Sequence, residues 1–239
     1  MSRSLLAGAS LALIASLAAC SPAAPLVAVA TAPEVVEAPV APVAISAPAG
    51  EYASDPNHSS ITFKLQHVGL SNYTMRFRTF DATVTFDPAN IPGSKVSAKV
   101  KPSDVLVGFP GDYVKNHPGT KFKSWEDDLA NSSKFLEAGA FPEIGFVSTG
   151  VEVSGVRTAK VTGDFTLRGV TKPLVLDVTF DGETPEHPFS KTPALGFTAT
   201  GAFKRSDFGL GPHLPAAMVG DEISVTIEGD FIGKAAATP

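Results

Sequence analysis

Cysteine is almost absent from this chain of 239 residues, which contains only Cys20. A single cysteine excludes an internal disulfide, and its position near the N-terminus leaves the rest of the chain without thiol chemistry. Packing alone must therefore hold any folded domain together. Tryptophan (1) and tyrosine (3) are also rare, whereas phenylalanine (16) is abundant. Most of the aromatic surface thus lacks a polar group, which suits an apolar interior filled either by side chains or by a ligand.

Charge patterns and motifs typical of several protein classes are missing as well. The formal net charge is −5 and the lysines are scattered, so no basic stripe points to nucleic acid. The histidines show neither H-x-H nor H-E-x-x-H spacing and predict no metal site. No combination of nucleophile, base and orienting group stands out, and no pair of suitably placed carboxylates. The sequence therefore favours a protein that is not an enzyme and uses no cofactor.

The longest apolar run, Ser4–Ala19, follows Arg3 and ends at Cys20. It is shorter than the roughly 20 residues of a membrane span and has the layout of a secretory signal. Leu17-Ala18-Ala19-Cys20 resembles the lipobox of bacterial lipoproteins, in which the cysteine is lipidated and becomes the mature N-terminus. We therefore predict a signal peptide over 1–20 and a lipid anchor at Cys20, on the periplasmic face of the bacterial envelope.

The predicted lipid anchor has a favoured destination membrane, and two alternatives to it stay open. Ser21 is uncharged, which by resemblance to the sorting rule of enteric bacteria favours the outer membrane. Cleavage after Ala28-Val29-Ala30 would instead release a soluble periplasmic protein that begins at Thr31. In the second alternative Cys20 is an incidental member of the apolar run.

Three further segments follow the signal. Residues 21–50 consist almost entirely of Ala, Pro and Val. Because proline lacks an N–H and fixes φ, we predict an extended linker of roughly 3 Å per residue. Residues 51–233 have the length of one domain, and 234–239 form a tail.

Apolar and polar residues alternate with period two through most of the domain, as in strands with one apolar face. The alternating segments are 59–67, 73–87, 96–101, 144–146, 161–167, 174–180, 195–204 and 223–231. The phase changes within 73–87, which predicts a bulge or bend. Residues 120–138 instead have helical spacing and predict one or two short helices after a Pro/Gly-rich loop at 108–119.

About eight strands with one apolar face predict an all-β protein, either an antiparallel barrel or a sandwich. Gly163 and Gly201 fall in the middle of strands on the apolar face, which favours the strongly coiled sheet of a barrel.

Three blocks of sequence resemble the YceI-like family. They are 55–63 with 67–71, then 163–173, and finally 205–209 with 219–223, and together they extend over essentially all of 51–233. The resemblance implies a lipocalin-like antiparallel barrel that binds a long polyisoprenoid, such as a polyprenyl phosphate or a quinone tail. The chain departs from the family pattern at 105–125, where a difference in head-group choice is expected if the segment borders the pocket.

Inward-facing aromatic residues are the candidate ligand contacts. They are Phe63, Phe77, Phe86, Phe146, Phe165, Phe180, Phe197 and Phe203, joined by His67 on the apolar face of the first strand. Two other interpretations stay open: a structural or partner-binding envelope module with a filled barrel, and an enzyme using His67 or His58 as acid or base.

The basic residues near the turns have two readings. Arg205 either pairs with Asp207 or contacts a phosphate head group, whereas Arg168 and Lys172 flank a turn and are expected to be solvated.

Overall fold

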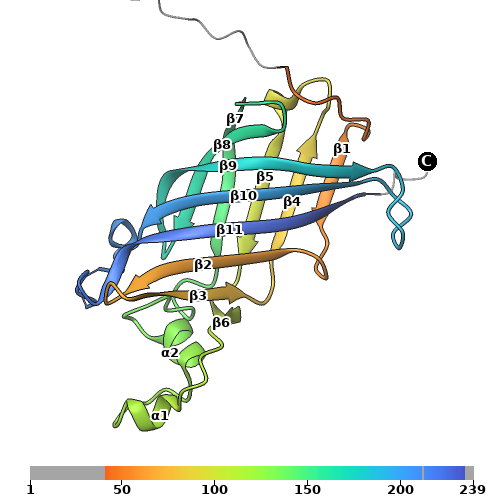
Figure 1. Ribbon diagram of the computed structural model, residues 1–239. Coiled ribbons are helices and arrows are strands. Elements are labelled where there is room, and N and C mark those ends of the chain that lie inside the picture. The colour runs from red at the N-terminus through yellow and green to blue at the C-terminus, as the bar shows by residue number, and fades with distance from the viewer. Residues whose placement is uncertain (1–40, 212, 235–239) are drawn as a thin grey trace, which may run out of the picture. The chain divides into compact units, whose positions relative to one another are not determined.

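The computed structural model describes residues 41–211 and 213–234 as one curved antiparallel sheet with short helices at one end (Figure 1). Its strands are β1 (Gly50–Ser54), β2 (Ser60–His67), β3 (Ser71–Phe77), β4 (Asp81–Phe86), β5 (Lys95–Val100), β6 (Val105–Leu106), β7 (Ile144–Val153), β8 (Thr158–Leu167), β9 (Val170–Thr184), β10 (Ala194–Lys204) and β11 (Val219–Gly233). Its helices are α1 (Tyr113–Asn116), α2 (Trp125–Asn131) and the 3-10 turns η1 (Ile91–Gly93), η2 (Pro102–Asp104) and η3 (Arg205–Phe208). The predicted signal peptide, the lipid site at Cys20, the linker up to residue 40 and most of the tail lie outside the described residues.

Eight of the strands form a closed ring. They follow the order β1-β4-β5-β7-β8-β9-β10-β11, and β1 closes the ring by pairing with β11 from Tyr52↔Gly233 to Ser54↔Phe231. The predicted all-β, eight-stranded antiparallel barrel is therefore confirmed. Gly163 sits at a close approach between β8 and β7, as its mid-strand position suggested: a Cβ there would lie 2.6 Å from the Val147 carbonyl oxygen.

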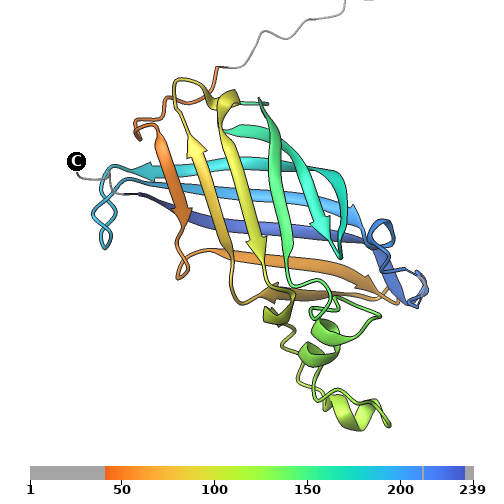
Figure 2. The ribbon, with the colours of Figure 1, turned by 180° about the vertical axis from the view of Figure 1, so that it is seen from behind.

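The long strand β11 has two partners along one edge. Its last residues pair with β1, whereas the segment 219–228 pairs with β2. β2 continues to β3 and β6, so these three strands extend the sheet beyond the ring (Figure 2). The phase change predicted within 73–87 corresponds to the break at 78–80 between β3 and β4.

Residues 43–47, which the sequence analysis assigned to the linker, pack against one end of the barrel. The Val43 amide donates to the Val156 carbonyl (2.6 Å) in the β7–β8 turn. Glu183 accepts hydrogen bonds from the Ser46 and Ala47 amides, at 2.8 and 2.7 Å. Val43, Ile45 and Ala47 also pack on the core cluster of Tyr52, Phe86 and Phe231. We call residues 43–47 the N-terminal strap.

The strap depends on an ionised carboxylate. Burial alone would raise the pKa of Glu183, but the hydrogen bonds donated by Ser46 and Ala47 outweigh it, so its pKa lies below the ordinary value.

The segment between β6 and β7, which we call the cover, lies at the opposite end of the barrel, where its Leu136 lines the cavity described below (Figure 1). α2 lies within the predicted helical region and is capped by Ser124, whose hydroxyl accepts from the Asp127 amide (3.2 Å). α1 falls in the segment that we expected to be loop, because four residues carry too little periodicity to be recognised. No helix among the described residues is long and apolar enough to cross a membrane.

Arg168 attaches this cover to the barrel, contrary to the expectation that it is solvated. Its guanidinium donates to the carbonyls of Ser133 and Phe135 and pairs with Glu137 at 3.0 Å. Arg168 and Gly169 both have positive φ and form the two-residue turn between β8 and β9. Leu136 lies between these anchored residues and packs against the core.

Candidate functional site

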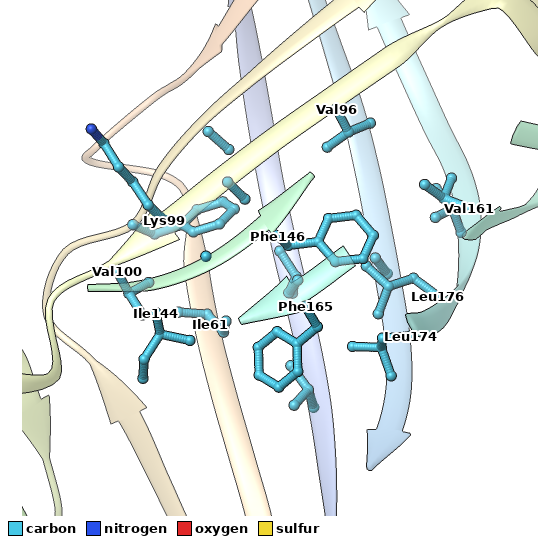
Figure 3. A pocket seen from close by; sticks show the side chains of 18 of the residues that line it. Ile61, Val96, Lys99, Val100, Ile144, Phe146, Val161, Phe165, Leu174 and Leu176 are labelled. Carbon is cyan, nitrogen blue, oxygen red and sulfur yellow. The ribbon is translucent and has the colours of Figure 1, made fainter. Parts of the chain in front are cut away.

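The interior of the barrel holds an apolar cavity with a volume of about 230 Å³ (Figure 3). Every residue of its lining is apolar except Ser94, Lys99 and Gly145. Several lining side chains, among them Phe63, Phe165 and Phe203, are only partly buried although they face inward. The interior is therefore hollow, which counts against a barrel filled by its own side chains.

The two polar side chains of the lining behave differently. Lys99 extends away from the cavity (Figure 3), and its ammonium group lies 3.8 Å from Asp81 and 4.0 Å from Glu143 on the outside. The Ser94 hydroxyl is buried, and among the described residues it has no hydrogen-bond partner. The cavity thus offers a ligand dispersion contacts and one free hydroxyl.

Seven of the eight phenylalanines proposed from the sequence line this cavity. They are Phe63, Phe77, Phe86, Phe146, Phe165, Phe197 and Phe203. Phe180 lies outside the lining and packs on Phe197 (5.7 Å between ring centres) in the core cluster near the strap. The contact of these residues with a ligand stays a prediction.

Most of the remaining lining consists of aliphatic residues that a list restricted to phenylalanine missed. Ala98, Val161 and Ala199 are examples, and the same period-two alternation would have found them. Leu136 and Leu210 come from outside the strands, so no strand pattern could indicate them. Of the described residues between Val100 and Ile144, Leu136 alone lines the cavity, so the unusual segment 105–125 does not.

The two candidate histidines lie near opposite ends of β2, with His58 two residues before its start and His67 as its last residue, and neither lines the cavity. With eight residues of roughly 3.3 Å each between them, they are too far apart to act on one group. His67 stacks on Tyr73, with 4.4 Å between ring centres. The His58 Nδ1 lies 2.7 Å from an Asp55 carboxylate oxygen.

His58 and Asp55 form a local pair at the break between β1 and β2. The hydrogen bond to Asp55 raises the pKa of His58, and the same bond, with one from the Asn57 amide, lowers the pKa of Asp55. The Asp55 amide also donates to the Asp230 carbonyl (2.7 Å), so the pair fixes the chain where β11 changes partners.

Arg205 has neither of the two roles expected from the sequence. It is buried and donates to the carbonyls of Leu210, Leu214, Val219 and Gly220, which shapes the loop before β11. Asp207 pairs instead with Lys172 at 3.5 Å. The predicted Arg205–Asp207 ion pair is therefore wrong, and a guanidinium with four backbone acceptors is not free for a phosphate.

Among the described residues, no group of histidine, cysteine, aspartate and glutamate side chains is arranged to hold a metal ion. Within 41–211 and 213–234, the cavity wall carries no titratable group that faces inward. What this arrangement can do is hold an apolar molecule away from water.

Comparisons with known proteins agree with this architecture. A UPF0312 protein of Pseudomonas syringae pv. tomato is 35% identical over 183 residues, covering 76% of this chain and 86% of that protein. A UPF0312 protein of Shewanella sp. (strain ANA-3) is also 35% identical over 183 residues, covering 76% of this chain and 87% of its own.

Solved structures show the same fold. BcnA of Burkholderia cenocepacia superposes with a TM-score of 0.61 at 20% identity, covering 74% of this chain and 98% of that protein. The YceI protein of Campylobacter jejuni gives 0.58 at 25% identity, covering 71% and 90%. The model of the YceI-like domain matches residues 52–231, which include all of the ring except its first and last residues. The chain belongs to the YceI-like family.

Proposed function

We propose that the barrel binds one long apolar molecule of isoprenoid type, such as a polyprenyl phosphate or a quinone tail, for carriage or buffering in the bacterial envelope. The observation that carries this proposal is the hollow interior, whose wall is apolar apart from Ser94, Lys99 and Gly145. At about 230 Å³ it exceeds the roughly 150 Å³ apolar cavity that stays dry and accepts benzene. The resemblance of the sequence to the YceI-like family supports the isoprenoid class.

The energetics favour reversible exchange with a membrane. A chain of about 40 carbons gains roughly 30 kcal/mol on leaving water, at about 0.8 kcal/mol per buried CH₂. Non-covalent affinities do not exceed about 21 kcal/mol, so water is not the relevant reference. In a bilayer the chain is already dry, and its net preference for the barrel is small. A lipid anchor at Cys20 would keep the barrel near such a bilayer and shorten the path of transfer.

Native mass spectrometry of the purified full-length protein, followed by extraction into organic solvent, tests the proposal. We expect an isoprenoid at one copy per chain. A bare protein that also fails to take up polyprenyl phosphate and quinone would overturn the proposal.

A matched pair of variants assigns the binding to the cavity. Ala199 lines it, and its neighbour Thr200 is exposed on the outside of β10. Ala199→Trp should abolish loading because the indole occupies the space of the ligand, whereas Thr200→Trp should load normally.

A further inference from the structure

The wall of the barrel is not hydrogen-bonded throughout. Strands β9 and β10 pair from Thr184↔Ala194 to Asp177↔Thr200, and there their pairing ends. Beyond this point residues 170–176 of β9 pair with β8 alone, and 201–204 of β10 pair with β11 alone. β9 bends toward the β8–β9 turn while β10 runs on beside β11 (Figures 1 and 2). Pro173, which has no N–H to donate, lies on the stretch of β9 that has no partner in β10, and prolines in sheets usually lie at such edges.

A second pocket, of about 630 Å³, occupies the place where the two strands separate. It is lined by Phe165, Lys172, Pro173, Leu174, Ala202, Phe203, Lys204, Asp207, Phe208 and Glu222. We call it the outer pocket. Phe165, Leu174 and Phe203 line both this pocket and the interior cavity. Of the residues that the structure describes, these three side chains lie on the boundary between the two spaces.

Two side chains of this boundary, Phe165 and Phe203, pack with Phe208 in an aromatic cluster. Phe165 lies 4.8 Å from Phe203 and 5.2 Å from Phe208 between ring centres, and Phe203 lies 5.4 Å from Phe208. Phe165 and Phe203 are only partly buried, so either ring can change its rotamer without displacing neighbours on every side. Phe208 lines the outer pocket but not the cavity.

The rim of the outer pocket is polar and loosely held. Lys172 on β9 and Asp207 on η3 pair at 3.5 Å across the separation, and both side chains are about half exposed. Such an exposed ion pair contributes little to stability, so it opens readily. Lys204 and Glu222, which face each other in the β10–β11 register, add one charge of each sign.

We infer that this separation is a lateral access route, through which an isoprenoid chain passes into the barrel while its polar end stays in the outer pocket. The inference rests on the proposed function and adds to it the path and the orientation of the ligand. The cavity is smaller than the roughly 300–1,000 Å³ of typical ligand sites, so a long chain must extend beyond it. The outer pocket supplies that volume, with an apolar floor for the chain and a polar rim for its end.

Uptake and release kinetics in the full-length protein test the route, with all-trans-retinol as a fluorescent isoprenoid probe. Ala202→Trp places an indole in the outer pocket and should slow association about tenfold, and it should also raise Kd because the indole takes volume that the bound ligand uses. Phe208→Leu removes part of the support of Phe165 and Phe203, leaves the lining residues of the cavity unchanged, and should speed both association and dissociation. The control is Ser97→Trp, at an exposed position on β5 outside either pocket, where both rates should stay unchanged.

The possible outcomes distinguish a failure of the lateral route from a failure of the proposed binding function. If the unaltered protein takes up retinol and neither Ala202→Trp nor Phe208→Leu changes the rates, the route is wrong and the binding function stands. If Arg168→Ala, which frees the cover over the end of the barrel, is the variant that speeds uptake, the ligand passes through the end and the lateral route is likewise overturned. If the unaltered protein binds neither retinol nor polyprenyl phosphate, the function fails and the route fails with it.

Discussion

Two buried serines at the barrel wall show how much depends on a single hydrogen bond. Ser94 and Ser148 are both 8% exposed. The Ser94 hydroxyl has no partner among the described residues, whereas the Ser148 hydroxyl accepts from the Val96 amide at 2.7 Å. Because an unpaired buried polar group costs about 1–3 kcal/mol, Ser94→Ala should raise the free energy of unfolding by about 1 kcal/mol.

Ser148→Ala is the matched comparison, since it makes the same chemical change and should have the opposite sign. It leaves the Val96 amide unpaired and should lower the free energy of unfolding by about 1–2 kcal/mol. Urea denaturation of both variants measures the difference. A loss of stability in Ser94→Ala equal to that of Ser148→Ala would show that the Ser94 hydroxyl has a partner after all.

Gly163 is required by the spacing of β7 and β8. An added Cβ would lie 2.4 Å from the Phe146 ring and 2.6 Å from the Val147 carbonyl oxygen, and the backbone atom cannot move aside cheaply. Gly163→Ala should therefore destabilise the barrel by about 2–3 kcal/mol, in the range of an overpacked core. Gly150→Ala on β7 is the control, because no atom lies within 4 Å of the added Cβ. Thermal unfolding of both variants decides the matter, and equal melting temperatures would contradict the argument.

At the scale of elements, the N-terminal strap is held by one carboxylate. Glu183 accepts from the Ser46 amide and hydroxyl and from the Ala47 amide. Glu183→Gln replaces one acceptor oxygen by an NH₂ group that faces these donors, and should cost about 1–2 kcal/mol near neutral pH. Faster proteolysis of the strap should accompany the loss.

The pH dependence of this effect has a definite sign. The folded-state pKa of Glu183 lies below its ordinary value of 4.5, so the carboxylate stabilises the fold above that pH and ceases to do so as the pH falls through the folded-state pKa. The difference between Glu183→Gln and the unaltered protein should therefore shrink in acid. The control, Glu186→Gln, removes only an exposed pair with Lys191 and should change stability by less than about 1 kcal/mol at any pH. A Glu183→Gln difference that is constant with pH would count against the carboxylate as the anchor.

The strands of the ring were largely predictable because period-two alternation survives wherever one face is apolar. β1 and β6 were missed because five and two residues are too short for a pattern. The strap was missed because its alanines and the flanking Pro42 and Pro48 resemble those of an extended linker, and its attachment comes from Glu183, far along the chain. Arg168 and Arg205 bond backbone carbonyls brought to them by the fold, which spacing in sequence does not reveal.

The candidate site, like the fold, was predictable from the sequence only in part. Alternation identified inward phenylalanines, and seven of them line the cavity. It did not indicate that the interior is hollow, because a filled and an empty barrel share one pattern and differ only in the volume left between side chains. Nor did it reveal that β9 separates from β10. The separation arises because one end of β9 stays paired with β8 while the adjoining end of β10 stays paired with β11.

At the scale of the whole molecule, a hollow barrel without an internal disulfide gives up packing that a ligand restores. A ligand that binds only the folded state stabilises it by about 2.7 kcal/mol at a hundred times its Kd. For a domain of this size, each kcal/mol raises Tm by roughly 2–4 °C, so saturating isoprenoid should raise Tm by about 5–10 °C. In Ala199→Trp the indole fills the cavity, which should offset part of the stability lost through its imperfect fit. Addition of isoprenoid should therefore not raise the Tm of this variant. A rise of equal size in both proteins would mean that the ligand binds outside the barrel, most simply on exposed apolar residues such as Leu70 and Phe189, and not in the cavity.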